Sequence, residues 1–583
     1  MSKPYRILLL VTASLVLGCS DPGLPNDADI IVVGAGIAGL AAALDAGNAG
    51  AEVLVLDANS VGGGHAVKAG GFALVGTELQ AKRGYADTPD IAFSDLMAWG
   101  EDADPEWVRH YVEFSDRDVH DWLAEMGVKF NIIIPTPESS VPRFHFAGGR
   151  AVKAVVPMMQ KALQMPTIRF LWNTRALRLL VNKQSVVGIV TENLRSGASA
   201  EYRATAVILA TGGFQSELAM VRENWRSDRR IPERLLIGSG EFATGDGYRL
   251  AEQAGAAFVR MDHQVTFING LPDPRTPDGS RALVTQNPAA IWVNSSGRRY
   301  VNEAASSKLV EAALFEEESA THWLIFDKHG KKSFGVRDAP WLNSETVNQE
   351  ILLNPEVTQS ANSIEELAIA AGLPSQVLIT TIRRFNEQVQ SGEDLDFQRF
   401  GPKIEAPAPA EIMQPPFYAV QLFPTTRKSM GGPAINLNGQ VLNAAGQPVP
   451  GLYAAGELTG VAGINGSHGG SGTFLGPALL TGRIAGQAAA AGIPGNRQPS
   501  TPTAQTADRT TTAGTPAEPF GPAELEPLIQ QARDGFWHFE ASHALVLERE
   551  YACNQCHSPA SPMAGAVTAQ QMLVRTNTCT NCH

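Results

Sequence analysis

The sequence predicts an α/β protein whose first domain is built on a Rossmann-like parallel sheet. Three observations lead to this fold class. An apolar strand over 29–33 runs directly into a glycine turn, GAGIAG, at 34–39; an alanine-rich helix follows over 40–49; and a second strand over 52–56 ends on Asp57. Strand, glycine turn, helix and second strand in this order are typical of a unit that binds a dinucleotide at the carboxyl ends of its strands.

The residue types of this unit suit that task. Gly34, Gly36 and Gly39 allow a tight turn and the close approach of a pyrophosphate, whose charge the N-terminus of the following helix stabilises. Asp57 follows Gly39 by 18 residues and can accept hydrogen bonds from ribose hydroxyls. A doubly wound fold without a cofactor is the alternative, and the complete strand-helix-strand context argues against it.

Glycine clusters also recur far along the chain. They are the runs 62–64 (GGG), 69–71 (AGG), 210–213 (ATGG), 244–247 (TGDG), 451–457 (GLYAAGE) and 469–472 (GGSG). Together with the first turn, they resemble the fumarate reductase and succinate dehydrogenase flavoprotein family, which includes ketosteroid dehydrogenases and tricarballylate dehydrogenase, over residues 28–492. The resemblance implies FAD, bound in an extended form by Gly34, Gly36, Gly39, Asp57, Gly63, Gly64, Gly70, Gly71, Thr211, Gly212, Asp246, Gly456, Glu457 and Ser471.

His65 bears on how FAD is held. Members such as succinate dehydrogenase attach FAD covalently through a histidine, but counting back from Gly70 and Gly71 puts the linking position of this chain on Gly64. We therefore expect His65 to line the flavin pocket, with covalent attachment as the alternative.

The resemblance also implies a division of the chain into domains. Residues 27–257 and 425–493 are expected to form the FAD-binding domain, and residues 258–424 an inserted α+β capping domain that borders the substrate. Residues 494–520 are rich in Pro, Thr, Ala and Gln, which is typical of a linker. Residues 521–583 are then expected to form a small, mostly helical tail domain.

A motif in the expected cap indicates a candidate proton donor. Residues 297–303 read GRRYVNE, and in the fumarate reductases that the chain resembles, the second arginine of a matching motif donates the proton for reduction of a C=C bond. Arg299 occupies that position. The relay that reprotonates this arginine is not preserved, since Gln286 and Ala289 replace its glutamate and arginine. A buried arginine normally stays charged, so an ion pair that stabilises the fold is the alternative role.

The residues that clamp a dicarboxylate in those reductases are altered as well. Phe267 stands at one histidine position, Arg427 and Lys428 occupy the second histidine region, and no arginine is present near His468. Without an arginine fork, the pocket suits fewer anionic groups or a more apolar substrate than fumarate. One carboxylate could still be held by Arg427, Lys428 or His468. We expect the catalytic residues to be Arg299, Thr285, Lys428 and His468.

Two Cys-x-x-Cys-His motifs, at 553–557 and 579–583, predict haem. The two cysteines of such a motif attach one c-type haem, and the histidine ligates its iron. We therefore expect two haems, held by Cys553, Cys556, Cys579 and Cys582, with axial ligands His557, His583, His538 and His543. Met563 and Met572 are alternative distal ligands, and a zinc site is the alternative to haem.

The first residues resemble a bacterial lipoprotein signal. Lys3 and Arg6 precede an apolar run over 7–17, which Gly18 and Cys19 follow. Cleavage before Cys19 would leave a lipidated cysteine, so we expect residues 1–19 to be a signal and the protein to be periplasmic and anchored to a membrane. The apolar run is too short to span a bilayer as a helix.

Composition and motifs together predict the kind of protein. A formal net charge of −13 without a basic run argues against nucleic acid as a partner, and 44% apolar residues can furnish large cores. We expect an exported flavocytochrome in which haems exchange electrons between FAD and a membrane or periplasmic partner. FAD then exchanges hydride with a small molecule, by reduction of an activated C=C bond of an unsaturated organic acid other than fumarate. The alternatives are a dehydrogenase of an organic acid or ketosteroid, and a non-catalytic electron-transfer module.

Overall fold

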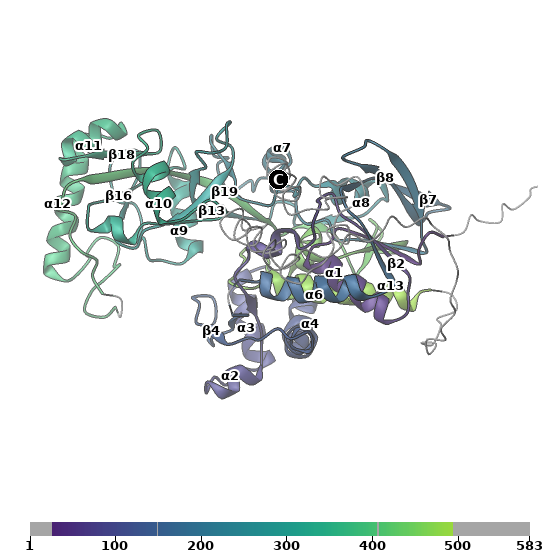
Figure 1. The fold of residues 1–583 in the computed structure, drawn as a ribbon. Coiled ribbons are helices and arrows are strands. Elements are labelled where there is room, and N and C mark those ends of the chain that lie inside the picture. The colour runs from purple at the N-terminus through teal and green to yellow at the C-terminus, as the bar shows by residue number, and fades with distance from the viewer. Residues whose placement is uncertain (1–25, 149, 405–406, 494–583) are drawn as a thin grey trace, which may run out of the picture.

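The computed structural model describes residues 26–148, 150–404 and 407–493, which form two lobes (Figure 1). The predicted signal, linker and dihaem domain lie outside these ranges. So do all the predicted haem residues: Cys553, Cys556, His557, Cys579, Cys582, His583, His538 and His543.

Five parallel strands and one antiparallel edge strand form the central sheet of the first lobe. β1 pairs in parallel with β10 and with β2, so that Ile30 lies opposite Ala206 and Val53. Every residue of β1 is buried, because both faces of the sheet are covered, and this explains why the strand is apolar throughout. The strand order is β21 (Gln440–Leu442), β22 (Pro448–Ala454), β10 (Ala206–Leu209), β1 (Ile30–Val33), β2 (Val53–Leu56) and β6 (Ile168–Leu171).

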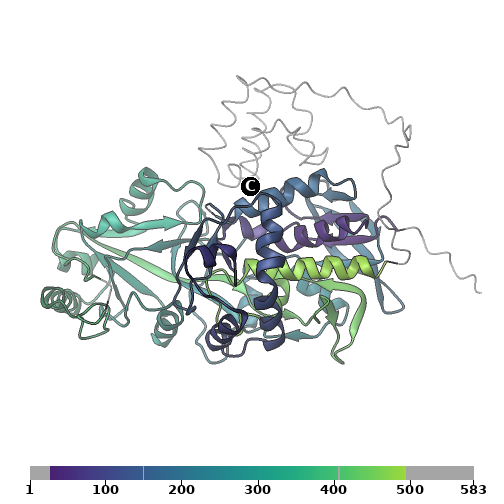
Figure 2. The same cartoon turned by 90° about the horizontal axis from the view of Figure 1, so that it is seen from below.

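Helices cover one face of this sheet and a second, smaller sheet covers the other (Figures 1 and 2). Ile30 and Val32 share a core with the helices, whereas Ile31 and Val33 face the small sheet. The helices are α1 (Ile37–Asn48), α6 (Val152–Gln164) and α13 (Leu475–Ala491); the other face carries β7 (Thr174–Asn182), β8 (Ser185–Asn193), β9 (Ser199–Arg203) and α8 (Asp246–Gln253).

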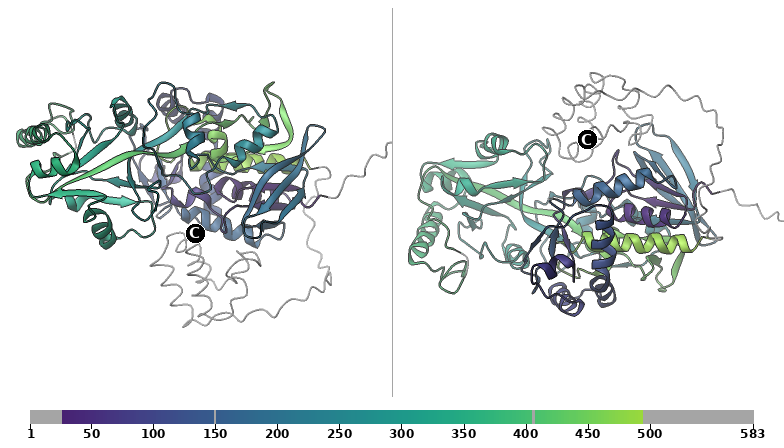
Figure 3. Two further views of the ribbon diagram at one scale, coloured as in Figure 1. Left: turned by 90° about the horizontal axis from the view of Figure 1, so that it is seen from above. Right: turned by 60° about the horizontal axis from the view of Figure 1, so that its bottom comes forward.

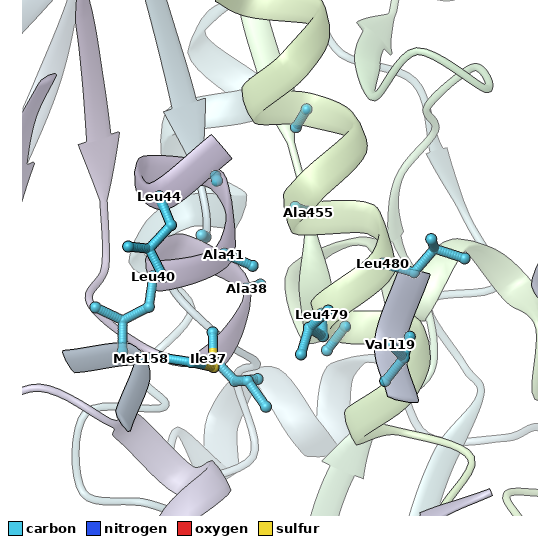
Figure 4. Packing of buried hydrophobic residues seen from close by; sticks show 14 of the residues in the cluster. Ile37, Ala38, Leu40, Ala41, Leu44, Val119, Met158, Ala455, Leu479 and Leu480 are labelled. Atoms are coloured by element: carbon cyan, nitrogen blue, oxygen red, sulfur yellow. The ribbon is translucent and has the colours of Figure 1, made fainter. Parts of the chain in front are cut away.

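Small residues bring α1 and α13 into close contact, as Figure 4 shows. A Cβ atom on Gly482 would lie 2.2 Å from the carbonyl oxygen of Ala38, and one on Gly486 would lie 2.3 Å from that of Ala42. Larger side chains would therefore push the two helices apart. The contact holds in place the first turn of α1, which directly follows the glycine turn of residues 34–36.

A helical region packs below these helices in Figure 1. Two of its helices begin with N-cap residues of the expected type. The side chains of Thr88 and Asp104 accept hydrogen bonds from backbone N–H groups of α3 and α4, and a proline follows each of these two residues. The region contains α2 (Glu78–Lys82), α3 (Pro89–Gly100), α4 (Pro105–Ser115), α5 (Trp122–Glu125) and the short strands β3 (Phe72–Ala73), β4 (Ile132–Ile134) and β5 (Phe144–Phe146).

The second lobe is built around an eight-stranded sheet with helices at its far end. The main path of the sheet is β15 (Ile291–Val293), β16 (His322–Phe326), β19 (Phe417–Ser429), β13 (Gln264–Pro272), β14 (Ala282–Gln286) and β17 (Gly335–Arg337), while β11 (Leu236–Ile237) and β18 (Thr358–Ala361) also pair with β19. Its helices include α9 (Ser307–Glu316), α11 (Ile364–Ala371) and α12 (Ser375–Ser391).

The long strand β19 connects the two lobes, as both views in Figure 3 show. Its first half pairs with β16 and β18 inside the second lobe, and its last residues pair with β11 and β13 beside the first lobe. Arg427 and Lys428 lie at this second end. The predicted domain boundary at 424 falls within the strand, so one continuous element carries cap residues to the cofactor side.

The α/β class predicted from the sequence is confirmed for the described residues. Among them, no helix has both the length and the apolar character needed to cross a membrane.

Candidate active site

A cavity of about 770 Å³ begins at the carboxyl edge of the central sheet and continues to the second lobe. Gly34 follows β1, Asp57 follows β2 and Thr211 lies just beyond β10, and all three line it. The carboxyl ends of parallel strands meet at one edge of a sheet. Segments that are far apart in the sequence therefore share one wall of the cavity.

The glycine turn forms the part of this wall where a pyrophosphate is expected. Gly34 has a φ of +105°, and a Cβ atom there would lie 2.4 Å from the carbonyl oxygen of Ala210. Gly36 lines the cavity, and none of the described residues comes within 4 Å of its Cβ position, so its backbone is open to a ligand. Gly39 lies outside the lining, and its Cβ would meet the carbonyl oxygen of Gly34 at 1.8 Å. Its role is to let the helix pack on the turn.

Asp57 is held in place as an acceptor. Its Oδ2 accepts the N–H of Ala35 and its Oδ1 accepts the N–H of Asn59, each at 2.7 Å. Burial raises the pKa of this carboxyl to about 6, although the two hydrogen bonds lower it. Each oxygen keeps acceptor capacity for ribose hydroxyls.

The hydroxyl of Thr211 provides further evidence that the cavity fits FAD. This hydroxyl is buried on the cavity wall and has no hydrogen-bond partner among the described residues. A buried polar group without a partner is costly, and a bound dinucleotide would supply one. The remaining predicted cofactor residues on the same wall are Gly63, Gly64, Gly212, Asp246, Gly456 and Glu457.

Three other predicted cofactor residues lie away from the cavity. Gly70 and Gly71 pack against β5, and a Cβ atom on Gly71 would lie 2.1 Å from the carbonyl oxygen of His145. The N–H of Ser471 donates to the carboxylate of Glu138. The contacts of Gly70, Gly71 and Ser471 in the structure are therefore packing and local hydrogen bonding.

Lys428, His65 and Glu457 form a polar cluster on the cavity wall. Nζ of Lys428 lies 3.1 Å from Nδ1 of His65 and 3.2 Å from Oε2 of Glu457. Burial, followed by the charge of Lys428, holds the pKa of His65 well below its usual range. The ring is therefore neutral, and its Nδ1 accepts from the ammonium. Burial also lowers the pKa of Lys428, and the nearby Arg427 adds to this effect while Glu457 opposes it.

Arg299 lies elsewhere, inside the cap lobe, and is not among the residues that line the cavity. Its Nε donates to Oε1 of Glu303 and its Nη2 to Oδ2 of Asp394, both at 2.9 Å. Burial lowers its pKa, but the hydrogen bonds and charges of Glu303 and Asp394 outweigh burial, and the pKa is raised. This geometry keeps the guanidinium charged. It favours the ion-pair role over proton donation.

Thr285 and His468 also lie outside the cavity lining. The hydroxyl of Thr285 is buried in β14 and donates to the carbonyl oxygen of Asn269 at 3.3 Å. Nε2 of His468 lies 3.6 Å from Oε2 of Glu101. Burial, followed by the charge of Lys308, lowers the pKa of His468 to about 4, so this histidine is neutral near pH 7. Of the four predicted catalytic residues, only Lys428 borders the cavity.

Arg427 and Phe267, which replace two histidine positions, are brought together. The guanidinium of Arg427 lies 5.1 Å from the ring centroid of Phe267. Its Nη1 also lies 2.7 Å from Oδ2 of Asp338 and 2.9 Å from the carbonyl oxygen of Gly238. Asp338 thus neutralises the charge that was expected to be free for a substrate carboxylate.

The wall residues that were missed at the level of the sequence include Lys68, Arg281 and Trp341. Lys68 had a usable signal, because it stands between two glycine clusters and three residues after His65. Arg281 and Trp341 come from cap loops, and nothing in their local sequence indicates the cavity. The described residues contain no group of three or more His, Cys, Asp or Glu side chains arranged to hold a metal ion.

The family model described as FAD binding domain matches residues 29–475. This chain belongs to that family. It is 31% identical over 476 residues to a fumarate reductase (cytochrome) of Shewanella frigidimarina, a match that covers 80% of this chain and 78% of the relative. It is 29% identical to a KsdD-like steroid dehydrogenase of Mycobacterium tuberculosis, with 82% of this chain and 98% of the relative covered.

A solved structure gives the same result for the fold. The open conformation of a flavocytochrome c3 fumarate reductase superposes with a TM-score of 0.66 at 29% identity, and the match covers 80% of this chain and 78% of that one. The protein is therefore an FAD-binding oxidoreductase whose relatives act on C=C or CH–CH groups. This assignment argues against the non-catalytic module.

Proposed function

We propose that the protein is an exported flavocytochrome that reduces an activated C=C bond of an unsaturated organic acid other than fumarate. The observation that carries the proposal is the continuous cavity, in which a dinucleotide-binding edge and cap residues of the 273–282 and 338–341 segments share one space with Lys428. A cofactor ring and a small substrate can meet there without crossing a protein wall.

FAD, when bound and reduced, would supply hydride to one carbon of the C=C bond. The other carbon needs a proton, and negative charge develops on the activating group of the substrate. Lys428 is suited to both tasks because it holds a proton at Nζ within the cavity and carries a positive charge near the reacting atoms. The neutral His65 ring and Glu457 orient this ammonium through contacts at 3.1 and 3.2 Å.

The contacts of Arg427 support a substrate other than fumarate. A dicarboxylate needs two cationic anchors, and Arg427 is already paired with Asp338 at 2.7 Å. Phe267 lies beside this pair, and neither Phe267 nor Arg427 is among the residues that line the cavity. The position of Arg427 therefore supports a substrate with one carboxylate and a larger apolar part.

The electron supply and the location belong to the same proposal. The two Cys-x-x-Cys-His motifs support two c-type haems that deliver electrons from a membrane or periplasmic donor. The relative from Shewanella frigidimarina carries "cytochrome" in its name. The signal-like residues 1–19 support export and a lipid anchor at Cys19. A pyridine haemochrome spectrum of the full chain, with mass spectrometry of its N-terminus, tests both.

The enzymatic test uses the purified holoenzyme under anaerobic conditions with reduced viologen as electron donor. We expect oxidation of the viologen with monocarboxylic enoates at higher kcat/KM than with fumarate. Lys428→Met should lower kcat at least about 100-fold, and Lys428→Arg should recover part of it, if the ammonium acts in the reaction. Fumarate as the best substrate, or full activity of Lys428→Met, would contradict the proposal.

Dehydrogenation is the second candidate, favoured by the match to a steroid dehydrogenase over 98% of that relative. The same preparation, with an artificial electron acceptor and saturated acids or ketosteroids, tests it. Turnover in this direction only would replace reduction with dehydrogenation.

A further inference from the structure

The cavity end that reaches the cap has an uneven distribution of charge. This end, here called the vestibule, is lined by Lys68 and by cap residues that include Arg281, Asp338 and Trp341. The segment 240–243 crosses beside it, and a Cβ atom on Gly240 would lie 3.6 Å from Cβ of His65. The vestibule therefore adjoins the Lys428–His65 cluster.

Some of the cations on or beside this part of the cavity have carboxylate partners among the described residues, and others do not. Arg275 also lines the cavity and is paired with Glu350 at 2.5 Å. Arg427 is paired with Asp338 at 2.7 Å, and Lys428 with Glu457 at 3.2 Å. Within the described residues, neither Lys68 nor Arg281 has a carboxylate at ion-pair distance. Glu241 and Asp273 also line the cavity, but both lie beyond that distance from the two cations.

The side chains that lack ion pairs also have hydrogen-bond donors that are not used. Arg281 uses Nη2 on the carbonyl oxygen of Ser239, at 2.8 Å, and no other hydrogen bond of its guanidinium is formed with the described residues. The ammonium of Lys68 has none with them. The indole N–H of Trp341 is buried and lacks a partner in the same part of the chain. The Lys68 ammonium, the remaining N–H groups of Arg281 and the indole N–H of Trp341 thus have donor capacity that no acceptor among the described residues uses.

Burial makes these charges unfavourable. It lowers the pKa of Lys68 to about 8, and the charge of Arg281 lowers it further while Asp338 opposes. Burial likewise lowers the pKa of Arg281. An anion placed between the two would relieve the desolvation and the mutual repulsion together.

We propose that Lys68 and Arg281 bind the carboxylate of the substrate in the vestibule, and that the side of the Trp341 ring away from Arg275, whose guanidinium lies 4.3 Å from the ring centroid, packs against its apolar part. The proposal rests on the proposed function and specifies its substrate as an unsaturated monocarboxylic acid with a flat or bulky apolar body. Arg427 takes no part in carboxylate binding because Asp338 holds it.

The test varies the charge on the enzyme and on the substrate separately. Each enoate that the holoenzyme reduces is compared with its methyl ester, in wild type, Lys68→Met and Arg281→Met. We expect each variant to lose roughly 10- to 100-fold in kcat/KM for the acid, the range for a hydrogen bond to a charged group, and less than about 3-fold for the ester. Lys68→Arg should restore the preference for the acid. Lys82→Met, on exposed α2, is the matched control.

An equal loss for acid and ester, or no loss for either, would overturn the proposal while leaving the proposed function in place. A binding experiment tests the carboxylate site even if the proposed reduction is not observed. Saturated monocarboxylates are titrated against the oxidised holoenzyme, and the perturbation of flavin absorbance is followed. If wild type responds and Lys68→Met does not, the carboxylate site stands even when no enoate is reduced. If the variants instead shift the flavin reduction potential without changing this titration, the cations act on FAD and the proposal is wrong.

Discussion

In the part of the cap lobe around Arg299, the buried cations are matched by carboxylates. Arg299 contacts both Glu303 and Asp394 at 2.9 Å, and Arg399 lies 3.2 Å from Glu303. At the cavity of the FAD-binding lobe, by contrast, Lys428 shares Glu457 with the backbone N–H of Ser429, and Lys68 has no anionic partner at ion-pair distance among the described residues. The pKa of Arg299 is raised, while the pKa values of Lys68 and Lys428 are lowered.

This difference separates structural charges from functional ones. A buried ion pair that is complete needs nothing further, and it stabilises one arrangement of the chain. A buried cation without a partner is maintained at a cost, and ligand binding is where such a cost can be recovered. Under the proposals above, Arg299 belongs to the fold, Lys68 is a buried cation without an anionic partner in the described part of the chain, and Lys428 is a buried cation that is paired with Glu457 but borders the cavity. Four experiments test this difference.

The largest effect is expected on FAD binding at Gly36, where only backbone atoms form the cavity wall. Gly36→Val introduces a side chain where nothing lies within 4 Å, at a φ of −73° that valine can adopt. FAD should be absent from the purified variant because the side chain fills the space of the pyrophosphate. The apoprotein should unfold within about 0.5 kcal/mol of the wild-type apoprotein. Flavin absorbance and thermal unfolding measure the two effects. A variant that retains FAD would place the cofactor elsewhere.

The next largest effect is expected in the cap. Arg299→Met removes the cationic partner of the buried Asp394 and leaves Glu303 with Arg399 alone, which should cost about 3–5 kcal/mol of stability. Urea unfolding measures it. Arg384→Met, which breaks the exposed pair with Asp396 on the same lobe, is the control and should leave the midpoint unchanged. Wild-type stability of Arg299→Met combined with loss of turnover would instead support the proton-donor role.

A smaller effect is expected of pH on kcat/KM for the acid substrate. The pKa of Lys68 is lowered to about 8, so its ammonium is charged below pH 8 and loses its charge as the pH rises above it. The value of kcat/KM reports the free enzyme, and for an acid substrate it should fall about 10-fold above pH 8. The methyl ester should show no such step, and Lys68→Met should lack it for the acid. An identical step for the ester would assign the titration to another group.

The smallest effect is expected where the lobes touch through an exposed pair. Lys308 at the start of α9 contacts Glu101 at the end of α3. Their side chains are 29% and 54% exposed, so solvent screens the pair. Glu101→Gln should destabilise the protein by less than about 1 kcal/mol at low salt. Thermal unfolding at high salt should show no difference from wild type. A large, salt-independent effect would indicate a buried contact.

Local patterns predicted the cofactor end well because its parts are close in sequence. The glycine turn and Asp57 are separated by few residues, and backbone sterics leave little choice at Gly34. The cap end was predicted less well. The motif that contains Arg299 predicts a functional or ion-paired arginine, but Asp394, which neutralises Arg299, is 95 residues away in the sequence. The pairing of Lys428 with His65 spans 363 residues.

The α/β class, the FAD fingerprint and the two Cys-x-x-Cys-His motifs could be predicted from the sequence, because each depends on short-range spacing and residue type. Which cations have partners became visible in the three-dimensional structure. That outcome depends on β19, which runs from the cap to the cofactor and carries Lys428 to His65 and Arg427 to Asp338. A charge acquires its role from the groups that surround it in space, and those groups come from distant parts of the chain.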